Sequence, residues 1–370
     1  MDILNPTLSF KRKKKEFRIL EERSKISQID HQDMLALIEN FPEQCVQAVK
    51  IGESFNLPHY RAISHLVIVG MGGSGIGGEL LADFTRPDIN LPVIVNRHYS
   101  LPQFVNQKSL VLICSYSGNT EEVLQAWEDA RKRRAKIIAV TTGGKLAQQA
   151  KMGDIPVLYI PFIGPPRSAL GYSFFPLLVV LQRFKLIPDR KLDITETIEV
   201  LMRLKNKFSP EGPAPENLAK QLAIKLYGYL PVIYGSQDTT SAVGSRWRTQ
   251  LNENSKTIAF SNVIPELNHN EIVGWEHSQE FTQHFQVIIL RDRTDNPRVQ
   301  KRQEITQRII RKDAAGITEI MGEGNSFLAR MFSLIYLGDF VSFYLAILKG
   351  VDPSTVNSIN FLKKSLEEVH

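Results

Sequence analysis

The chain has 370 residues, 43% of them hydrophobic and 23% charged, with a formal net charge of +6, as expected of a globular protein with room for two domains. Its two cysteines, Cys45 and Cys114, exclude a disulfide framework and favour the reducing environment of the cytoplasm. No signal peptide opens the chain, and no uninterrupted apolar run reaches the ~18 residues of a membrane span, so no membrane partner is expected; the longest such run is 174–181.

The N-terminal segment, residues 1–60, is predicted to be helical between residues 16 and 57. Leu35, Ile38 and Phe41 form an apolar stripe at helical spacing there. The basic run 11–15 precedes this stripe. A solvated tail explains the run better than nucleic-acid binding does, because no aromatic residues are interleaved with the basic ones. We therefore expect no nucleic-acid partner.

Strands and helices alternate along the first expected domain, residues 61–207. Apolar runs predict strands at 66–70, 91–95, 109–114, 136–140 and 156–160, and helical patterns predict helices at 75–84, 119–134 and 145–151. The basic run 131–134 ends one of these helices, where cations suit the negative end of the dipole. The alternation indicates a parallel, doubly wound sheet, which binds ligands beyond the carboxyl ends of its strands.

Two loops leave strands at that end of the expected sheet. One is glycine-rich, GMGGSGIGG at 70–78, and the other, SYSGNT at 115–120, carries the hydroxyls of Ser115, Ser117 and Thr120. A strand–loop–helix of this kind directs backbone N–H groups and the positive end of a helix at one point. The two loops therefore predict an anion site, and phosphate is the anion that fits best.

The glycine-rich loop also fits two alternatives to a phosphate site. The spacing Gly70-x-Gly72-x-x-Gly75 occurs in dinucleotide-binding turns as well, although no acidic residue follows the strand 91–95 to hold a ribose. Arg97 stands there instead, which leaves NADP possible. The glycines would also serve a tight turn with no ligand, but that does not explain the hydroxyls of the second loop. No P-loop motif occurs.

A second α/β domain is expected over residues 216–370. The stretch FSPEGPAP at 208–215 is dense in proline and is the best candidate for a linker. Strands are predicted at 230–236, 285–290 and 317–320, with a helix at 241–252 and a long apolar helix at 326–349. The second half therefore repeats the architecture of the first.

Five motifs resemble one enzyme family. GGSG at 72–75 and SYSGNTEE at 115–122 resemble the sugar isomerase (SIS) domain. PPRSALGY at 165–172, NENSK at 252–256 and LNHNE at 267–271 narrow the resemblance to the bifunctional phosphoglucose/phosphomannose isomerases. The resemblance implies two SIS-type domains, each a doubly wound, flavodoxin-like parallel sheet flanked by helices. It also implies phosphate binding at Gly72, Gly73, Ser74, Ser115, Ser117 and Thr120.

The same resemblance implies a metal-independent reaction without a cofactor. Glucose 6-phosphate and/or mannose 6-phosphate would interconvert with fructose 6-phosphate through an enediolate, which needs a base, ring opening and stabilisation of negative charge. Glu253 would be the base, His269 would open the ring across a homodimer interface, and Arg167 would stabilise the enediolate. Lys363, or Lys364 in a shifted register, would be the C-terminal active-site lysine. Ser354 or Thr355 would lie in the region that sets specificity at C2.

Two other functions remain open at this point. A non-catalytic SIS-fold sensor of sugar phosphates would need only the two loops, and an SIS isomerase of another sugar phosphate would share the same motifs. A metal-dependent isomerase would need clustered ligands, and neither His-x-His nor His-Glu-x-x-His occurs. His269 and Glu271 form His-x-Glu without a following Pro-Cys-x-x-Cys, which excludes a zinc deaminase. We therefore expect no metal.

Overall fold

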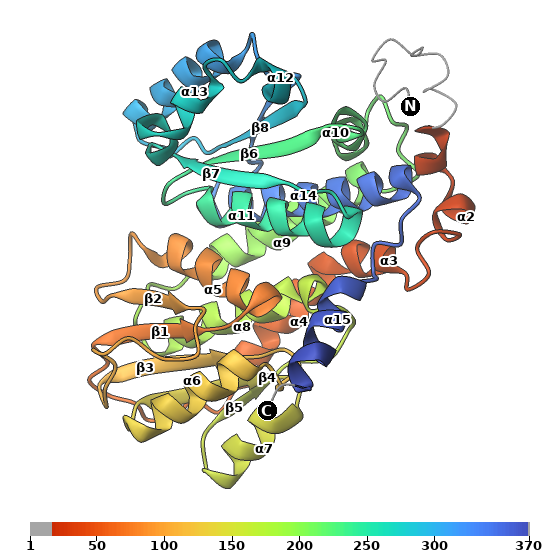
Figure 1. Ribbon diagram of the computed structural model, residues 1–370. Helices are drawn as coiled ribbons and strands as arrows, with labels where there is room; N and C mark the ends of the chain where they lie inside the picture. Colours follow the sequence, from red (N-terminus) through yellow and green to blue (C-terminus); the bar gives the residue numbers. More distant parts are fainter. Residues whose placement is uncertain (1–16, 369–370) are drawn as a thin grey trace.

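The computed structural model describes residues 17–368, which build two parallel β-sheets separated by a layer of helices (Figure 1). The first sheet has the order β2-β1-β3-β4-β5 and the second the order β7-β6-β8-β9, and all neighbouring strands run parallel. The strands are β1 (His65–Val69), β2 (Val93–Asn96), β3 (Ser109–Cys114), β4 (Lys136–Thr141), β5 (Val157–Tyr159), β6 (Leu230–Ser236), β7 (Phe260–Ile264), β8 (Phe285–Arg291) and β9 (Gly316–Met321). The predicted α/β fold with two doubly wound sheets is confirmed.

Helices cover both faces of each sheet. The layer between the sheets contains α4 (Phe41–Ser54), α5 (Gly72–Thr85), α8 (Leu170–Arg183), α9 (Lys191–Phe208), α10 (Leu218–Leu226), α11 (Ser241–Ser255) and α14 (Phe327–Lys349). The outer face of the first sheet carries α6 (Glu121–Lys132) and α7 (Gly144–Met152), and that of the second carries α13 (Pro297–Ile310).

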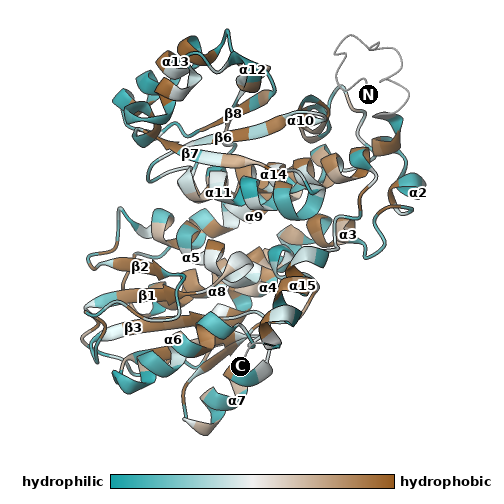
Figure 2. Cartoon of the chain, viewed as in Figure 1, coloured by the Kyte–Doolittle hydropathy of each residue, from teal (hydrophilic) through white to brown (hydrophobic). Residues whose placement is uncertain are grey.

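Alternate strand residues supply the two faces of each sheet. In β1, Leu66 and Ile68 join the central apolar cluster between the sheets, whereas Val67 and Val69 pack under α6 and α7. Strands that are buried on both faces appear in the sequence as continuous apolar runs, and such runs are easy to predict as strands. Figure 2 shows these strands as largely hydrophobic ribbons.

The most apolar helix, α14, lies at the centre of the molecule. Its 23 residues are long and apolar enough to cross a membrane, but 94% of its most hydrophobic 18-residue window is buried inside the protein. It packs against α9, α10 and α11, as a core helix does. The run 174–181 lies within α8; α14 is the longer apolar helix, although Arg330 and Asp339 interrupt its apolar residues.

The structure corrects the predicted elements at several places. Helix α5 begins at Gly72 rather than at residue 75, and β7, α8, α9, α10 and α13 have no counterpart among the predictions. The helices predicted between residues 16 and 57 are present as η1 (Phe17–Glu21), α2 (Arg23–Ile26), α3 (Met34–Glu39) and α4. The basic run 11–15 lies outside the described residues.

The two halves of the chain share their packing. Helix α9, which precedes the proline-rich stretch, packs on α14 from the second half, and one apolar cluster extends between the sheets. The stretch itself joins α9 to α10, and Lys220 of α10 donates hydrogen bonds to the carbonyls of Pro210 and Gly212. The domain limits at residues 60, 207 and 216 stay a prediction.

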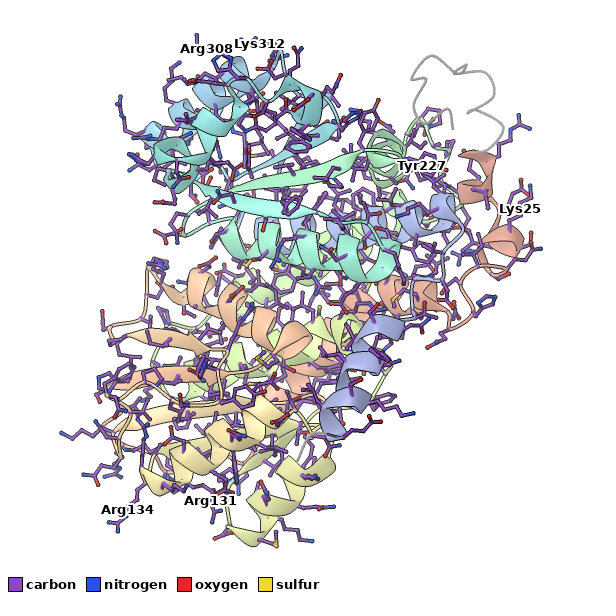
Figure 3. All side chains as sticks on the ribbon, viewed as in Figure 1. Lys25, Arg131, Arg134, Tyr227, Arg308 and Lys312 are labelled. Atoms are coloured by element: carbon purple, nitrogen blue, oxygen red, sulfur yellow. The ribbon has the colours of Figure 1, made fainter. Side chains whose placement is uncertain are left out.

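The second basic run lies on the surface. Arg131 and Arg134, at the end of α6, point away from the molecule in Figure 3. Within the same run, Arg133 pairs with Asp129 at 2.7 Å, one helical turn earlier. This arrangement agrees with a helix end that carries solvated cations.

Candidate active site

The candidate site begins where β1 and β3 end. In the order β2-β1-β3-β4-β5 the connections change direction between β1 and β3, and such a switch point opens a crevice beyond the strand ends. Gly70 follows β1 and Ser115 follows β3, so the two loops meet there, as predicted.

The glycines of the first loop allow close packing around the N-terminus of α5. Gly72 has a φ of +49°, a left-handed conformation that glycine adopts without strain. A Cβ added at Gly73 would lie 2.7 Å from the carbonyl oxygen of Pro166. Only glycine at this position lets the short helix η2 (Pro166–Ser168), and with it Arg167, approach α5 so closely.

The predicted phosphate-binding hydroxyls lie around the second loop. Ser74 Oγ accepts a hydrogen bond from the backbone N–H of Tyr116 (3.2 Å) and so ties the two loops together. Ser115 Oγ and Thr120 Oγ1 share a hydrogen bond of 2.9 Å. Ser117 is exposed, and the side chain of Thr120, the N-cap residue of α6, makes no capping hydrogen bond to the helix. The loop therefore presents hydroxyls and a helix N-terminus, a combination that suits an anion.

Arg167 is a buried centre of hydrogen bonds. Its guanidinium donates to Asn254 Oδ1 (2.6 Å), to Glu253 Oε2 (3.3 Å) and to the backbone carbonyls of Pro353 (2.7 Å) and Ser354 (3.0 Å). The side chain is only 4% exposed. Burial lowers the pKa of Arg167 and the Glu253 carboxylate opposes this shift. Arg167 is thus not a surface arginine, and its hydrogen bonds join three distant parts of the chain.

Glu253 lies in the last turn of α11, half-buried beside Arg167. The same helix carries Arg246, which donates to the carbonyl of Arg167 (3.1 Å) and pairs with Asp339 of α14 (2.8 Å). Gln250 donates to the other oxygen of Asp339 (2.8 Å). These buried bonds fix α11 against η2, so the position of Glu253 relative to Arg167 is set by rigid elements.

A small cavity of about 40 Å³ lies between α5 and α11. Its walls include Gly72, Gly73, Arg167 and Glu253. The cavity thus brings together the glycine-rich loop, the predicted base and the predicted cation. A larger cavity of about 660 Å³ lies between α4, α8 and α9, but it is far from the strand ends and holds no cluster of hydroxyls.

His269 is not part of this arrangement within one chain. It is exposed at the end of η3 (Glu266–His269), which follows β7, and the pairing of Ser236 with Ile264 puts η3 near the start of α11. Glu253 is 12 residues further along α11, which corresponds to roughly 18 Å at 1.5 Å per residue. The two predicted acid–base groups therefore lie near opposite ends of α11: His269 near its start and Glu253 in its last turn.

The C-terminal residues also lie partly at the site and partly away from it. Ser354 is buried and reaches Arg167 through its carbonyl, and its own hydroxyl has no hydrogen-bond partner within residues 17–368. Thr355 donates to the carbonyl of Asp352 (3.3 Å). Lys363 and Lys364 are exposed on α15 (Asn357–Glu367), and neither is among the residues that line the cavity.

Three further basic residues lie near the cavity, and none of them was predicted to take part in an isomerase site. Arg97 lines it, paired with Glu79 at 3.0 Å rather than free for a nucleotide phosphate, and Arg248 of α11 lines it as well. Lys256 caps the end of α11 by donating to the carbonyl of Glu253 (2.9 Å), and burial lowers its pKa to about 8. The position of Lys256 in the NENSK motif, three residues after Glu253, was the available signal for this lysine. Within residues 17–368, no cluster of three or more His, Cys, Asp or Glu side chains is arranged to hold a metal ion.

Comparisons with known proteins agree with the motifs. Residues 215–366 match the family model of the bacterial phospho-glucose isomerase C-terminal SIS domain. The chain is 47% identical over 338 residues, 91% of this chain and 99% of the other, to the bifunctional phosphoglucose/phosphomannose isomerase of Caldicellulosiruptor bescii. It is 38% identical to the protein of the same name from Aquifex aeolicus, over 85% of this chain and 92% of the other.

Solved structures share the fold. The crystal structure of a glucose-6-phosphate isomerase like protein from Thermus thermophilus matches with a TM-score of 0.60 at 18% identity, over 93% of this chain and 98% of the other. At this identity the match concerns the fold alone. Together with the extent and identity of the sequence matches, the geometry leads to one conclusion: the chain belongs to the family of bifunctional phosphoglucose/phosphomannose isomerases.

Proposed function

We propose that the protein is a metal-independent aldose–ketose isomerase that interconverts glucose 6-phosphate and mannose 6-phosphate with fructose 6-phosphate. The observation that carries the proposal is the contact of Arg167 with Glu253, 86 positions apart in sequence, in a cavity that also includes Gly72 and Gly73. A sensor would need the phosphate loops but not a buried cation paired with a half-buried carboxylate. The names of the relatives from C. bescii and A. aeolicus favour the same activity.

In this proposal, the phosphate binds at the hydroxyl loop. A hexose phosphate exceeds the cavity of about 40 Å³, so the sugar carbons lie against the Arg167–Glu253 pair and the phosphate extends towards Ser117 and the N-terminus of α6. Glu253 carries the proton between C1 and C2. Arg167, with its fixed positive charge, stabilises the enediolate oxygens. Return of the proton to either face of C2 would give either epimer.

The proposal includes a homodimer in the cytoplasm. His269 is at the other end of α11 from Glu253, so a His269 that opens the ring has to come from a second copy. The exposed helix α15 supports such a contact, because Ile359, Phe361 and Leu362 leave apolar surface uncovered on it. Lys363 lies on this same helix and would reach a site only through a rearrangement or through the partner.

A coupled assay on fructose 6-phosphate in the presence of EDTA tests the function. Glucose 6-phosphate and mannose 6-phosphate are detected separately, and Glu253→Gln serves as the variant that keeps the shape of the side chain. Both products from the wild type and neither from the variant are expected. Binding of fructose 6-phosphate without turnover would move the protein to the class of sensors, and glucose 6-phosphate alone would remove the mannose half.

A further inference from the structure

A third cavity lies on the outer face of the second sheet. It measures about 310 Å³ and is enclosed by aromatic side chains from β6, β7, β8 and η4 (Glu271–Trp275), namely Tyr234, Phe260, Phe285 and Trp275. Phe260 and Phe285 are the first residues of their strands, so the cavity opens near the amino ends of the strands. The phosphate loops lie on the other half of the molecule, beyond the carboxyl ends of β1 and β3. The proposed isomerase reaction does not use this cavity.

The aromatic walls are held in place by packing and hydrogen bonds. Trp275 and Phe285 meet edge to face, with ring centroids 5.8 Å apart and an interplanar angle of 89°. Trp275 Nε1 donates to the hydroxyl of Tyr234 (3.0 Å), and this hydroxyl donates in turn to Glu271. Burial, and next the nearby Glu271, raise the pKa of Tyr234, so its hydroxyl remains a donor at any physiological pH. The cavity is therefore formed before any ligand arrives.

Polar residues also line this apolar space, and Glu271 is the charged one among them. Glu271 accepts from Tyr234 and, through its second oxygen, from Asn262, and each carboxylate oxygen keeps a lone pair for another donor. No lysine or arginine is among the lining residues, so the negative charge has no cation inside the cavity.

Thr282 gives a second, independent sign of a ligand. It lines the cavity, its side chain is 4% exposed, and its hydroxyl has no hydrogen-bond partner within the described range 17–368. An unpaired buried hydroxyl destabilises the folded protein, and a bound polar group would offset this cost.

We propose that this cavity binds a small ligand with a planar aromatic ring and a cationic nitrogen group. The ring packs on Phe260 and Phe285, the more exposed of the aromatic walls, the cation pairs with Glu271, and the hydroxyl of Thr282 accepts a further N–H. A volume of about 310 Å³ suits one or two rings rather than a peptide. Aromatic faces attract cations, so the aromatic walls and the Glu271 carboxylate both favour a positively charged ligand.

Occupancy of the cavity would act on His269, and this part rests on the proposed function. Glu271 is two residues after His269, and the two lie in the consecutive short helices η3 and η4. A cation that pairs with Glu271 binds the lone pairs that Tyr234 and Asn262 leave free and pulls the carboxylate towards itself. The segment that carries the predicted ring-opening group would shift with it.

Benzamidine, a planar aromatic cation, is the probe for the first experiment. Isothermal titration calorimetry on the full chain is expected to show one saturable site per chain. Benzoate has a similar size and the opposite charge, and it should bind at least about tenfold more weakly, a difference of ~1.4 kcal/mol. No binding of benzamidine, or equal binding of both compounds, would overturn the proposal.

Gly274→Leu locates the site. Gly274 lines the cavity, and a Cβ there meets nothing within 4 Å, so a leucine fits without a clash and is expected to narrow the cavity. Loss of benzamidine binding with an unchanged melting temperature is expected, whereas Val273→Leu, an exposed neighbour, should bind as the wild type does. Full binding by Gly274→Leu would refute this location.

The coupling to His269 is tested by a separate readout. Benzamidine at saturation is expected to lower the rate of fructose 6-phosphate isomerisation in the wild type but not in Gly274→Leu. Binding with no change in rate would reject the coupling and leave the ligand site. A wild type that binds benzamidine but never isomerises fructose 6-phosphate would instead count against the proposed function.

Discussion

Arg167 has two tasks in this molecule, one structural and one chemical. Its guanidinium satisfies the carbonyls of Pro353 and Ser354 and the amide oxygen of Asn254, and it also faces Glu253. A planar group with five donors is required for so many acceptors, and lysine has neither the shape nor the number.

Arg167→Lys is therefore expected to lose both stability and activity. Unpaired carbonyls should lower the free energy of unfolding by about 1–3 kcal/mol, and kcat should fall by a factor on the order of 10²–10³ as enediolate stabilisation is lost. Urea unfolding and the coupled assay measure the two effects.

Arg183→Lys is the matched control for Arg167→Lys. Arg183 donates to the carbonyls of Gly52 and Phe55 (2.8 and 2.6 Å), away from the cavity at Glu253. A loss of stability with an unchanged kcat is expected of it. A kcat for Arg167→Lys that stays within twofold of the wild type would reject the role of Arg167 in the reaction.

At the same scale, the sequence predicted some site residues better than others. Arg167 and Glu253 belong to compact motifs, and the structure brings them together. Burial of Arg167 and its bonds to Pro353 and Ser354 were not predictable, because they join segments 186 and 187 positions apart through the packing of η2. The roles of the six phosphate-loop residues, His269 and Lys363 stay predictions.

Among the elements, the approach of η2 to α5 decides where Arg167 lies. Gly73→Ala would put a Cβ 2.7 Å from the Pro166 carbonyl, and η2 would have to move. A displacement of about 1 Å at a reacting group costs roughly a hundredfold in rate, so kcat should drop by that order while the fold persists.

Gly244→Ala is the matched change in another helix of the site. A Cβ at Gly244 of α11 would contact Ile233 at 3.6 Å, an ordinary distance, and alanine favours a helix over glycine. This variant is expected to keep its kcat and to be as stable as the wild type or more so. Equal kcat values for Gly73→Ala and the wild type would contradict the account of η2.

The contact between α5 and α11 contains a buried carboxylate. Asp83 of α5 accepts hydrogen bonds from Ser241 Oγ (2.9 Å) and from the N–H of Ala242 (3.3 Å) at the start of α11. Burial raises the pKa of Asp83 above its ordinary 3.8. The native state thus holds this proton at a higher pH than the unfolded chain does.

The sign of the resulting pH dependence follows from linkage. Between the unfolded pKa and the raised native pKa, the native state binds more protons, so stability falls as the pH rises through this window and stays lower above it. Asp83→Asn keeps an oxygen for both hydrogen bonds and should remove this part of the pH dependence. Unfolding free energies of both proteins, measured from mildly acidic to neutral pH, test it; parallel curves would contradict the effect.

For the whole molecule, the sequence predicted the architecture more completely than it predicted the individual helices and strands and their boundaries. Buried parallel strands are continuous apolar runs, so most of them were found, whereas β7 was missed because its residues, FSNVI, are mostly half-exposed at a sheet edge. Helices α8 and α9 pack between the sheets rather than on one of them, which no local pattern reveals. The separation of His269 from Glu253 is likewise a property of the folded chain alone.

Mixed dimers test whether His269 acts across an interface. Glu253→Gln and His269→Ala chains, each inactive alone, are refolded or co-expressed together in equal amounts. Half of the dimers formed at random are mixed, and each has one site with both residues intact, so roughly a quarter of the wild-type activity should return. No recovery would show that His269 does not serve the partner's site.

The central claim is that Glu253 transfers a proton between C1 and C2 of a sugar phosphate without a metal. The most direct test incubates fructose 6-phosphate with the protein in D₂O and EDTA and measures deuterium at C2 of the products by NMR. The account predicts glucose 6-phosphate and mannose 6-phosphate with the wild type, with deuterium at C2 in those molecules whose proton exchanged with solvent while it was on Glu253, and neither product nor exchange with Glu253→Gln. Undiminished product formation or undiminished exchange in the variant would contradict it.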